Sequence, residues 1–375
     1  MPKAFTCGEV MSLVDRLAPF RLAEPWDNVG LQLGDPRAPA RRVAVALETT
    51  PDIVRQVRRR RADVLIVHHP LFFKPIKSVT RQTPAGAMAL DLIAARVALI
   101  AAHTNLDASP CGTNAAAAER LGLRRVAPYA DLDPRPAAAC KFVVFVPQGH
   151  ERAIMEAIAR GGGGLIGAYD HCSFRSLGIG AYRPQEGAHP FAGQPGRLEE
   201  AEEWRIEAEV PRAALAKVLR EARAVHPYEE MAYDVYPRER ADPGFSMGVV
   251  GELPRPASLG ALTRRLKRLL PGGDPAVFVG DARRPVAQVA VFTGAGAAAI
   301  EAWRGQAGAL ITGEITHHAA REAEARGIAV IAAGHFATEQ PVAAFFAKHL
   351  QRAEEIRQNH VEVFALERIK SPFKG

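Results

Sequence analysis

Cysteine is scarce in this sequence of 375 residues, and its four cysteines lie far apart. Cys7, Cys111, Cys140 and Cys172 form no Cys-x-x-Cys pair. Thiolate zinc clusters need closely spaced pairs, and disulfide frameworks belong to short, cysteine-dense chains, so both kinds of site are disfavoured. A metal site in this chain would have to be built from histidine and carboxylate side chains.

Long apolar runs are missing as well. No stretch approaches the roughly 18 to 20 apolar residues that span a bilayer. The first residues, Met1–Cys7, lack the apolar core of a signal peptide. These absences predict a cytoplasmic protein without a membrane partner.

The positive charge of the chain is not accompanied by the features of a nucleic-acid-binding surface. A net charge of +7 and an isoelectric point near 9.4 permit anionic partners such as nucleotides. The basic residues are spread along predicted helical faces, as at 264–268, without interleaved aromatic rings or a known reading motif. A solvated helix face explains them better, so a nucleic-acid partner is not expected.

The chain is long enough for two or three domains. Its 48% of hydrophobic and 24% of charged residues are typical of a globular protein. Predicted strands alternate with helices near both ends of the chain, which indicates mostly parallel sheets covered on both faces. A helix at 51–61 is expected to be capped by Thr50. The strands are expected at 42–48, 64–67, 97–102, 288–294, 309–314 and 328–333.

The pattern changes in the middle of the chain. A linker at 131–136 precedes a strand, helix, strand, strand, helix and strand, which is the ferredoxin-like order. We therefore predict an α/β fold with a first α/β lobe at 1–130, an inserted ferredoxin-like α+β domain at 131–240 and a second α/β lobe at 241–375.

Histidines and carboxylates lie just past the ends of several predicted strands. In open α/β sheets, ligands bind outside the carboxyl ends of the strands. Imidazole nitrogens and carboxylate oxygens are common metal ligands. The candidates are His68, His69, His103, Asp107, Glu314, His335 and Glu339.

These candidates outnumber the ligands that one tetrahedral ion takes beside a water. The sequence therefore favours a two-metal site, bridged by Glu339, that would hold a hydroxide and clamp a substrate oxygen. Simpler roles stay open. Asp107 could cap the helix after Pro110, and Glu339 could favour the first turn of a helix that Thr338 is expected to cap. His103 could orient Asp107, bind an ion or carry a proton.

Other motifs have simpler explanations. Gly294 and Gly296 could cradle a phosphate, but close packing of their turn explains this fragment better, and no Walker-type loop is present. His317 and His318 are expected to be exposed helix residues. No metal-ligand spacing unites the three histidines of the middle unit, His171, His189 and His226.

Several motifs resemble one known family. They are HHPLFF at 68–73, HTNLD at 103–107, ITGE at 311–314, GHFATE at 334–339 and WDNVGLQ at 26–32. Together they resemble the Nif-three-like dinuclear-metal-centre proteins, also labelled type 2 homologues of GTP cyclohydrolase 1. The middle unit, with YDHCSF at 169–174 and HPYEE at 226–230, is similar to the inserted PII-like domain of the longer bacterial members.

The resemblance implies a two-lobed, three-layer α/β/α core and a toroidal homohexamer, with the PII-like insert over the ring openings. It also implies a dinuclear centre in each subunit, with two divalent cations. Zinc, iron, manganese and nickel all suit such a centre. Its ligands would be His68, His69, Asp107, His335 and Glu339.

The expected function is that of a metal-dependent hydrolase of a nucleotide-like or other anionic small molecule, with His103 or Glu314 moving protons. The family label suggests hydrolytic opening of the imidazole ring of GTP with release of formate. The alternative is a non-catalytic, metal-binding hexameric assembly or regulatory protein whose PII-like domain binds an effector.

Overall fold

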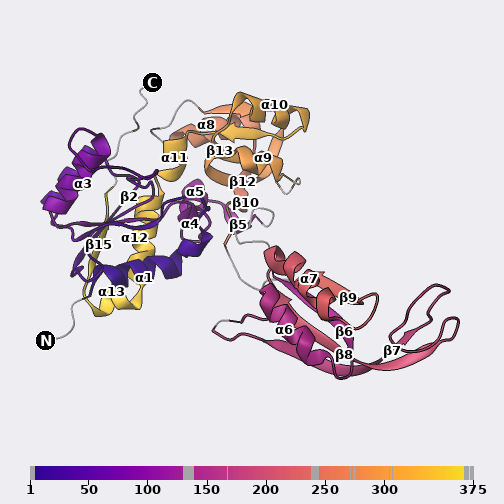
Figure 1. Cartoon of the computed structure of the whole chain (residues 1–375). Coiled ribbons are helices and arrows are strands. Elements are labelled where there is room, and N and C mark those ends of the chain that lie inside the picture. Colours follow the sequence, from indigo (N-terminus) through magenta and orange to yellow (C-terminus); the bar gives the residue numbers. More distant parts are fainter. Residues whose placement is uncertain are drawn as a thin grey trace. The chain divides into compact units, whose positions relative to one another are not determined.

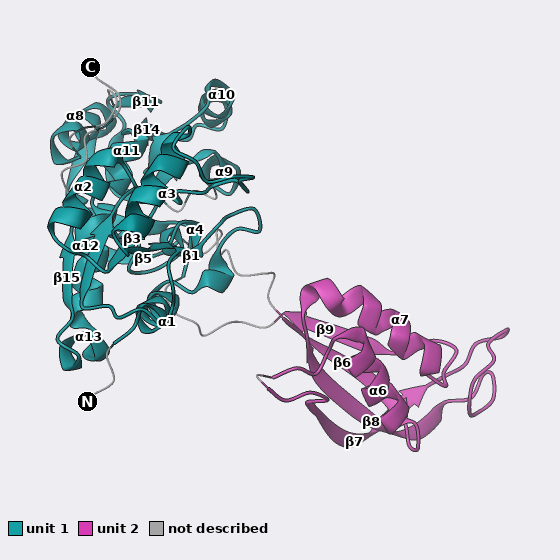
Figure 2. Ribbon diagram, turned by 60° about the vertical axis from the view of Figure 1, so that its left-hand side comes forward, with its two compact units in different colours: residues 1–134, 243–375 teal, residues 135–242 magenta. Residues whose placement is uncertain are grey.

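The computed structural model divides the chain into two compact units (Figure 2). Unit 1 comprises residues 1–134 and 243–375, and unit 2 comprises residues 135–242. The linker expected at 131–136 lies outside the described residues. These are 5–129, 139–166, 168–237, 245–270, 272, 276–303, 305, 307–366 and 371. None of the helices in these ranges combines the length and the apolar character that crossing a bilayer demands.

The first sheet of unit 1 has the strand order β1-β4-β3-β2-β15. Two of its strands, β2 and β15, are labelled in Figure 1. The strands from β4 to β15 run parallel to their neighbours, and β1 is antiparallel at the edge. The strands are β1 (Gly30–Leu33), β2 (Arg42–Ala46), β3 (Val64–Val67), β4 (Ala98–Ala101) and β15 (Glu362–Ala365).

Both faces of this sheet are buried, which is why its strands are continuous apolar runs. Val64 and Ile66 of β3 belong to one hydrophobic core, and Leu65 and Val67 belong to another. Helices α1 and α12 contribute to the first core, and α2 and α3 contribute to the second. The helices and the short 3₁₀ turn around this sheet are α1 (Cys7–Leu17), η1 (Phe20–Leu22), α2 (Pro51–Arg59), α3 (Pro84–Ala94), α4 (Thr104–Asp107), α12 (Val342–Arg352) and α13 (Glu354–Gln358).

Helix α2 starts where the sequence predicts. The hydroxyl of Thr50 accepts a hydrogen bond from the amide of Ile53 at 3.2 Å, and Pro51 occupies the first turn. The helix ends at Arg59, two residues earlier than expected, and Arg61 takes a positive φ of 52°. This tight turn leads directly into β3, the strand that precedes the two histidines.

The second sheet of unit 1 has the order β11-β14-β13-β12-β10-β5. Only β12, β13 and β14 are parallel to one another, so the prediction of a mostly parallel sheet is wrong here. Two prolines, Pro254 and Pro256, hide the strand pattern of β10, whose register with β12 shifts between Glu252 and Ala257. The strands are β5 (Arg124–Pro128), β10 (Val249–Ser258), β11 (Val277–Val279), β12 (Pro285–Ala295), β13 (Ala309–Glu314) and β14 (Val330–Ala332).

Helices cover both faces of the second sheet too, so that each sheet is the middle layer of an α/β/α arrangement. Helices α5, α8 and α11 contribute to one core, and α9 and α10 contribute to the other. These helices are α5 (Thr113–Leu121), α8 (Leu259–Leu269), α9 (Ala297–Glu301), α10 (His317–Ala325) and α11 (His335–Glu339).

The two chain segments of unit 1 exchange strands. From the second segment, β15 pairs with β2 in the first sheet, and Val363 lies opposite Val43. From the first segment, β5 pairs with β10 in the second sheet, and Pro128 lies opposite Val249. Each sheet is therefore complete only when both segments are folded.

Unit 2 has the element order β-α-β-β-α-β and one antiparallel sheet with the strand order β7-β8-β6-β9. This is the ferredoxin-like arrangement. Both helices pack on one face of the sheet, against residues such as Phe142 and Ile206 (Figure 2). The elements are β6 (Cys140–Pro147), α6 (Glu151–Gly161), β7 (Ser173–Tyr182), β8 (Glu199–Val210), the 3₁₀ turn η3 (Arg212–Ala214), α7 (Leu215–Val225) and β9 (Tyr233–Pro237).

Candidate metal centre

His68 and His69 follow directly after β3, and the end of β2 holds their backbone. Both amides donate hydrogen bonds to the carbonyl of Leu47, at 3.0 and 2.8 Å. The Nδ1 atom of His68 lies 3.1 Å from the carbonyl oxygen of Ala102. Because a carbonyl only accepts, Nδ1 must carry the hydrogen, and Nε2 keeps its lone pair.

The Nε2 atom of His68 is a buried polar atom without a hydrogen-bond partner. It lies 3.6 Å from Asp107 Oδ1 and 3.8 Å from Glu339 Oε1, and the His68 residue is only 1% exposed. A buried nitrogen that faces two carboxylates without a hydrogen bond favours a cation among the three groups. The three residues therefore fit a metal ion, and their ligand atoms all lie within 4.8 Å of one another.

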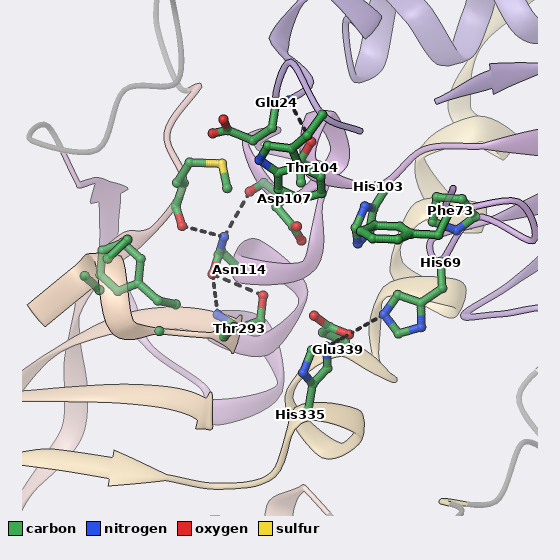
Figure 3. A pocket seen from close by; sticks show the side chains of 18 residues that line it. Glu24, His69, Phe73, His103, Thr104, Asp107, Asn114, Thr293, His335 and Glu339 are labelled. Atoms are coloured by element: carbon green, nitrogen blue, oxygen red, sulfur yellow. Dashed lines mark hydrogen bonds and ion pairs between the residues drawn. The ribbon is translucent and has the colours of Figure 1, made fainter. Parts of the chain in front are cut away.

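A second group of ligands meets on the other oxygen of Glu339. Oε2 lies 2.9 Å from His69 Nε2 and 3.1 Å from His335 Nε2, and Figure 3 shows the two rings pointing toward this carboxylate. His69, His335 and Glu339 also satisfy the spacing of a metal site. The structure thus brings the five residues expected as ligands into two groups that share Glu339.

The carboxylates and imidazoles of this cluster shift one another's pKa values. Burial opposes the positive charge on His69, but the hydrogen bond to Glu339 and the nearby carboxylate of Glu48 outweigh it and raise its pKa to about 10. The hydrogen bond to Glu339 likewise raises the pKa of His335 to about 9. Burial raises the pKa of Asp107. Burial also opposes the charge on Glu339, but hydrogen bonds from His335 and His69 hold its pKa well below the usual value.

Glu339 lies at the end of a short helix that the sequence analysis did not separate from the next one. Thr338, expected as a helix cap, instead lies inside α11, and its hydroxyl donates to the carbonyls of Gly334 and His335. The cap prediction is wrong because the chain turns at Pro341, which occupies the N-cap position of α12. The extra turn of helix carries His335 and Glu339 on one face.

The turn at Gly294 packs closely against Glu339. Its φ is +67°, and a Cβ atom at this position would lie 2.4 Å from Glu339 Oε1. The neighbouring Gly296 has no more room, because a Cβ atom there would lie 2.0 Å from the hydroxyl oxygen of Thr312. The two glycines are explained by close packing, as the sequence predicts.

Asp107 does not cap the following helix. It is the last residue of α4, whereas Gly112 occupies the N-cap position of α5. The hydroxyl of Thr113 donates a hydrogen bond to Asp107 Oδ1, and the side-chain amide of Asn114 donates to the Asp107 carbonyl at 2.9 Å. These contacts from α5 fix the carboxylate beside His68.

His103 pairs with Asp27 and not with Asp107. Its Nδ1 lies 2.9 Å from Asp27 Oδ1, and the other oxygen of Asp27 accepts a hydrogen bond from the amide of Thr104 at 3.0 Å. No local pattern in the sequence assigns this role to Asp27, although the residue belongs to the WDNVGLQ motif. His103 also forms a possible ligand group with His68 and His69.

Glu314 stands outside these ligand groups. It is the last residue of β13 and its side chain is exposed. Its Oε1 lies 3.1 Å from Nδ1 of His335, the nitrogen that does not face Glu339. This contact orients the ring of His335. His317 and His318 are exposed in the first turn of α10, as expected, and neither belongs to a ligand group among the described residues.

The Duf34/NIF3 (NGG1p interacting factor 3) model matches residues 5–372. The chain belongs to the DUF34/NIF3 family. Two curated relatives are named GTP cyclohydrolase 1 type 2 homolog. The relative from Mycobacterium tuberculosis is 37% identical, and the match covers 89% of this chain and 88% of the relative. The relative from Bacillus subtilis is 32% identical, and the match covers 100% of this chain and 99% of the relative.

Solved structures of this family agree with the fold. A Bacillus cereus protein related to NIF3 is 33% identical over 99% of both chains, with a TM-score of 0.66. A Staphylococcus aureus protein is 25% identical over 100% of both chains, with a TM-score of 0.71. The family resemblance of the motifs is thus confirmed along nearly the whole chain.

In this DUF34/NIF3 protein, the ligand groups open into a cavity of about 840 Å³. His69, His103 and Glu339 line it together with Trp26 and Phe73 (Figure 3). The rings of Trp26 and Phe73 lie 5.7 Å apart, and both side chains are largely exposed although they are apolar. The cavity therefore joins a cluster of side chains that could hold metal ions to an aromatic wall.

Proposed function

We propose that this protein is a hydrolase that depends on two divalent metal ions and acts on a nucleotide-like or other anionic small molecule. The observation that carries this proposal is the sharing of Glu339. One of its oxygens faces His68 and the other faces His69 and His335. His68, Asp107 and Glu339 would hold one ion, and His69, His335 and Glu339 the other.

Two ions in such a site supply a nucleophilic hydroxide at neutral pH and stabilise negative charge on the substrate. The chain itself would handle the protons. Asp27 fixes Nδ1 of His103 and leaves its Nε2 available to give or take a proton next to the cavity. Glu314 would keep the ring of His335 in its binding orientation.

The aromatic wall of the cavity favours a substrate with a flat ring. Trp26 and Phe73 offer exposed ring faces beside His103, and a purine base would stack on such faces. The relatives' name supports GTP as one candidate. Opening of its imidazole ring with release of formate breaks both C–N bonds of one carbon, and each cleavage consumes a water.

The assembly and the insert belong to the same proposal. The family resemblance supports a cytoplasmic hexameric ring in which unit 2 is a PII-like domain. Light scattering coupled to gel filtration would measure the mass of the assembly. Loss of the hexamer on removal of the metal, without turnover of any nucleotide, would favour the alternative of a non-catalytic, metal-binding assembly or regulatory protein.

Metal analysis of purified protein tests the proposed centre. Wild type should hold about two divalent ions per chain, and Glu339→Gln and His68→Ala should each lose most of this metal and all turnover. Glu322→Gln, an exposed glutamate of α10, is the matched control and should retain both. Wild type that stays free of metal after reconstitution would contradict the proposal.

A further inference from the structure

Unit 2 contains a cavity of its own, of about 460 Å³. It is lined by the end of β7 with Tyr182, by the loop that joins β7 to β8, and by the segment that follows α7 with Tyr228. The two segments are tied together, because the amide of His189 donates a hydrogen bond to Glu229 Oε2 at 2.9 Å. The volume is that of a small-molecule site.

Three aromatic rings meet at an angle on the wall of this cavity. The ring of Tyr228 lies 5.9 Å from that of Phe191 and 6.4 Å from that of Tyr182, with interplanar angles of 47° and 49°. Phe191 is 54% exposed, so its ring is largely left uncovered by the surrounding chain. The faces of such rings carry partial negative charge and attract cations.

A buried carboxylate completes the wall. Glu203 of β8 is only 9% exposed, and its Oε1 accepts a hydrogen bond from the hydroxyl of Tyr228 at 2.7 Å. No lysine or arginine in the described part of unit 2 forms an ion pair with Glu203. The side chain of Glu203 takes this position only because residue 180 is a glycine: a Cβ atom there would lie 2.3 Å from Glu203 Oε2. A buried charge of this kind favours a cation beside it.

The charged residues around the cavity also favour a positively charged ligand. Three carboxylates line it, those of Glu203, Glu229 and Glu230, against the single guanidinium of Arg183. A metal ion does not suit the site, since every group of metal-ligand spacing among the described residues lies in unit 1. Rings and a carboxylate together instead match the recognition of organic ammonium groups.

We propose that this cavity binds a small alkylammonium cation. Its charged head would lie against the rings of Tyr182, Phe191 and Tyr228, with Glu203 as its counter-ion. This site is separate from the metal centre and does not depend on the proposed hydrolase activity. It gives unit 2 a ligand chemistry of its own.

Calorimetric titration of the full chain with choline tests the proposal. The control ligand is 3,3-dimethylbutan-1-ol, which has the same shape with carbon in place of the charged nitrogen. Choline should bind saturably, and the neutral alcohol should bind roughly tenfold more weakly or worse. Equal affinity for the two ligands, or no saturable binding of either choline or tetramethylammonium, would overturn the proposal.

Three variants separate the cation site from a general apolar pocket. Glu203→Gln keeps an acceptor for Tyr228 but removes the charge, and it should weaken choline binding roughly tenfold. Phe191→Ala should also weaken it, and this exposed position leaves the fold intact. Arg183→Gln should strengthen binding, because it removes a like charge from the wall. The circular dichroism spectrum and the thermal unfolding curve of each variant should match those of wild type, which verifies its fold.

The signs of these effects decide the outcome. If Glu203→Gln and Phe191→Ala both leave the affinity unchanged, choline binds elsewhere and the proposal is wrong. If Glu203→Gln strengthens binding and Arg183→Gln weakens it, the wall does not select a cation, and the proposal is again wrong.

Discussion

Single acceptor groups behind the histidines orient the imidazole rings of the candidate metal centre. The carbonyl of Ala102 holds Nδ1 of His68, and the carboxylate of Asp27 holds Nδ1 of His103. Each acceptor fixes one tautomer and one ring orientation. The side chain of Asp27 is fully inaccessible to solvent, so its charge is committed to this pair.

Substitution of Asp27 by Asn tests the strength of the pair. Burial opposes the charge on Asp27, but hydrogen bonds from His103 and Thr104 outweigh it and lower its pKa from 3.8 to about 2. A carboxylate with a lowered pKa stabilises the fold above its unfolded pKa, and this contribution is lost as the pH falls through the folded pKa. The shift corresponds to ~2 kcal/mol.

We therefore expect the free energy of unfolding of metal-free Asp27→Asn to be ~2 kcal/mol lower than that of wild type near neutral pH. The difference should shrink between about pH 4 and about pH 2. Urea unfolding followed by circular dichroism at a series of pH values measures it. A difference that stays constant over this range would show that the charge of Asp27 does not stabilise the fold.

Phe73 tests the aromatic wall of the large cavity. If a flat ring of the substrate stacks on it, Phe73→Ala should lose ~1 to 2 kcal/mol of binding, or roughly a five- to thirtyfold rise in KM, with kcat little changed. Steady-state kinetics with GTP or another accepted nucleotide gives both constants. Phe278→Ala, a partly exposed phenylalanine of β11, is the matched control. An equal rise in KM in both variants would show that the aromatic wall does not bind the substrate.

At the scale of elements, the metal centre depends on how closely the end of β12 approaches α11. Gly294 sits at this approach with a positive φ and no room for a side chain beside Glu339. Gly327 has nearly the same φ, +66°, but nothing lies within 4 Å of a Cβ atom placed there. A comparison of the two glycines therefore separates the effect of the positive φ from the effect of crowding beside Glu339.

Alanine at each of these glycines should give different results. Both Gly294→Ala and Gly327→Ala should lower the free energy of unfolding by ~1 to 2 kcal/mol through the positive φ. Only Gly294→Ala should also displace Glu339 and reduce the metal content. Thermal unfolding and metal analysis of the two proteins check this. Equal metal content in both would contradict the expectation that a side chain at position 294 displaces Glu339.

The sequence predicted the elements whose signal is local and missed those that depend on distant partners. The apolar run before His68 and the Thr50 cap are read from adjacent residues, and the structure has both. The strand β10 is hidden by its prolines, and it forms only because β12 and β5 lie on either side of it. The contact of Asp27 with His103 spans 76 residues, so no local pattern could predict it.

At the scale of the whole molecule, unit 2 is inserted between two strands that are already paired. Tyr129 follows β5, and its amide donates a hydrogen bond to the carbonyl of Gly248 just before β10, at 2.9 Å. The chain thus leaves and re-enters unit 1 at neighbouring points of one sheet. A short loop is enough to join such points.

Deletion of the insert should therefore leave unit 1 intact. A chain in which a short glycine-serine loop replaces residues 131–244 is expected to fold and to hold as much metal as the full chain. Metal analysis and circular dichroism of the shortened protein measure this. A shortened chain that binds no metal, although it is folded, would mean that unit 2 contributes to the centre.

The pairing of β15 with β2 bears on how the chain is made. The ribosome synthesises β2, β3 and β4 long before α12 and β15, yet one core of the first sheet includes Phe346 and Leu350 of α12 and Val363 of β15. During translation this apolar face therefore stays exposed until α12 and β15 have been synthesised. Nascent chains that stop before residue 342 should accordingly attract chaperones, because partly built sheets expose apolar surface that aggregates.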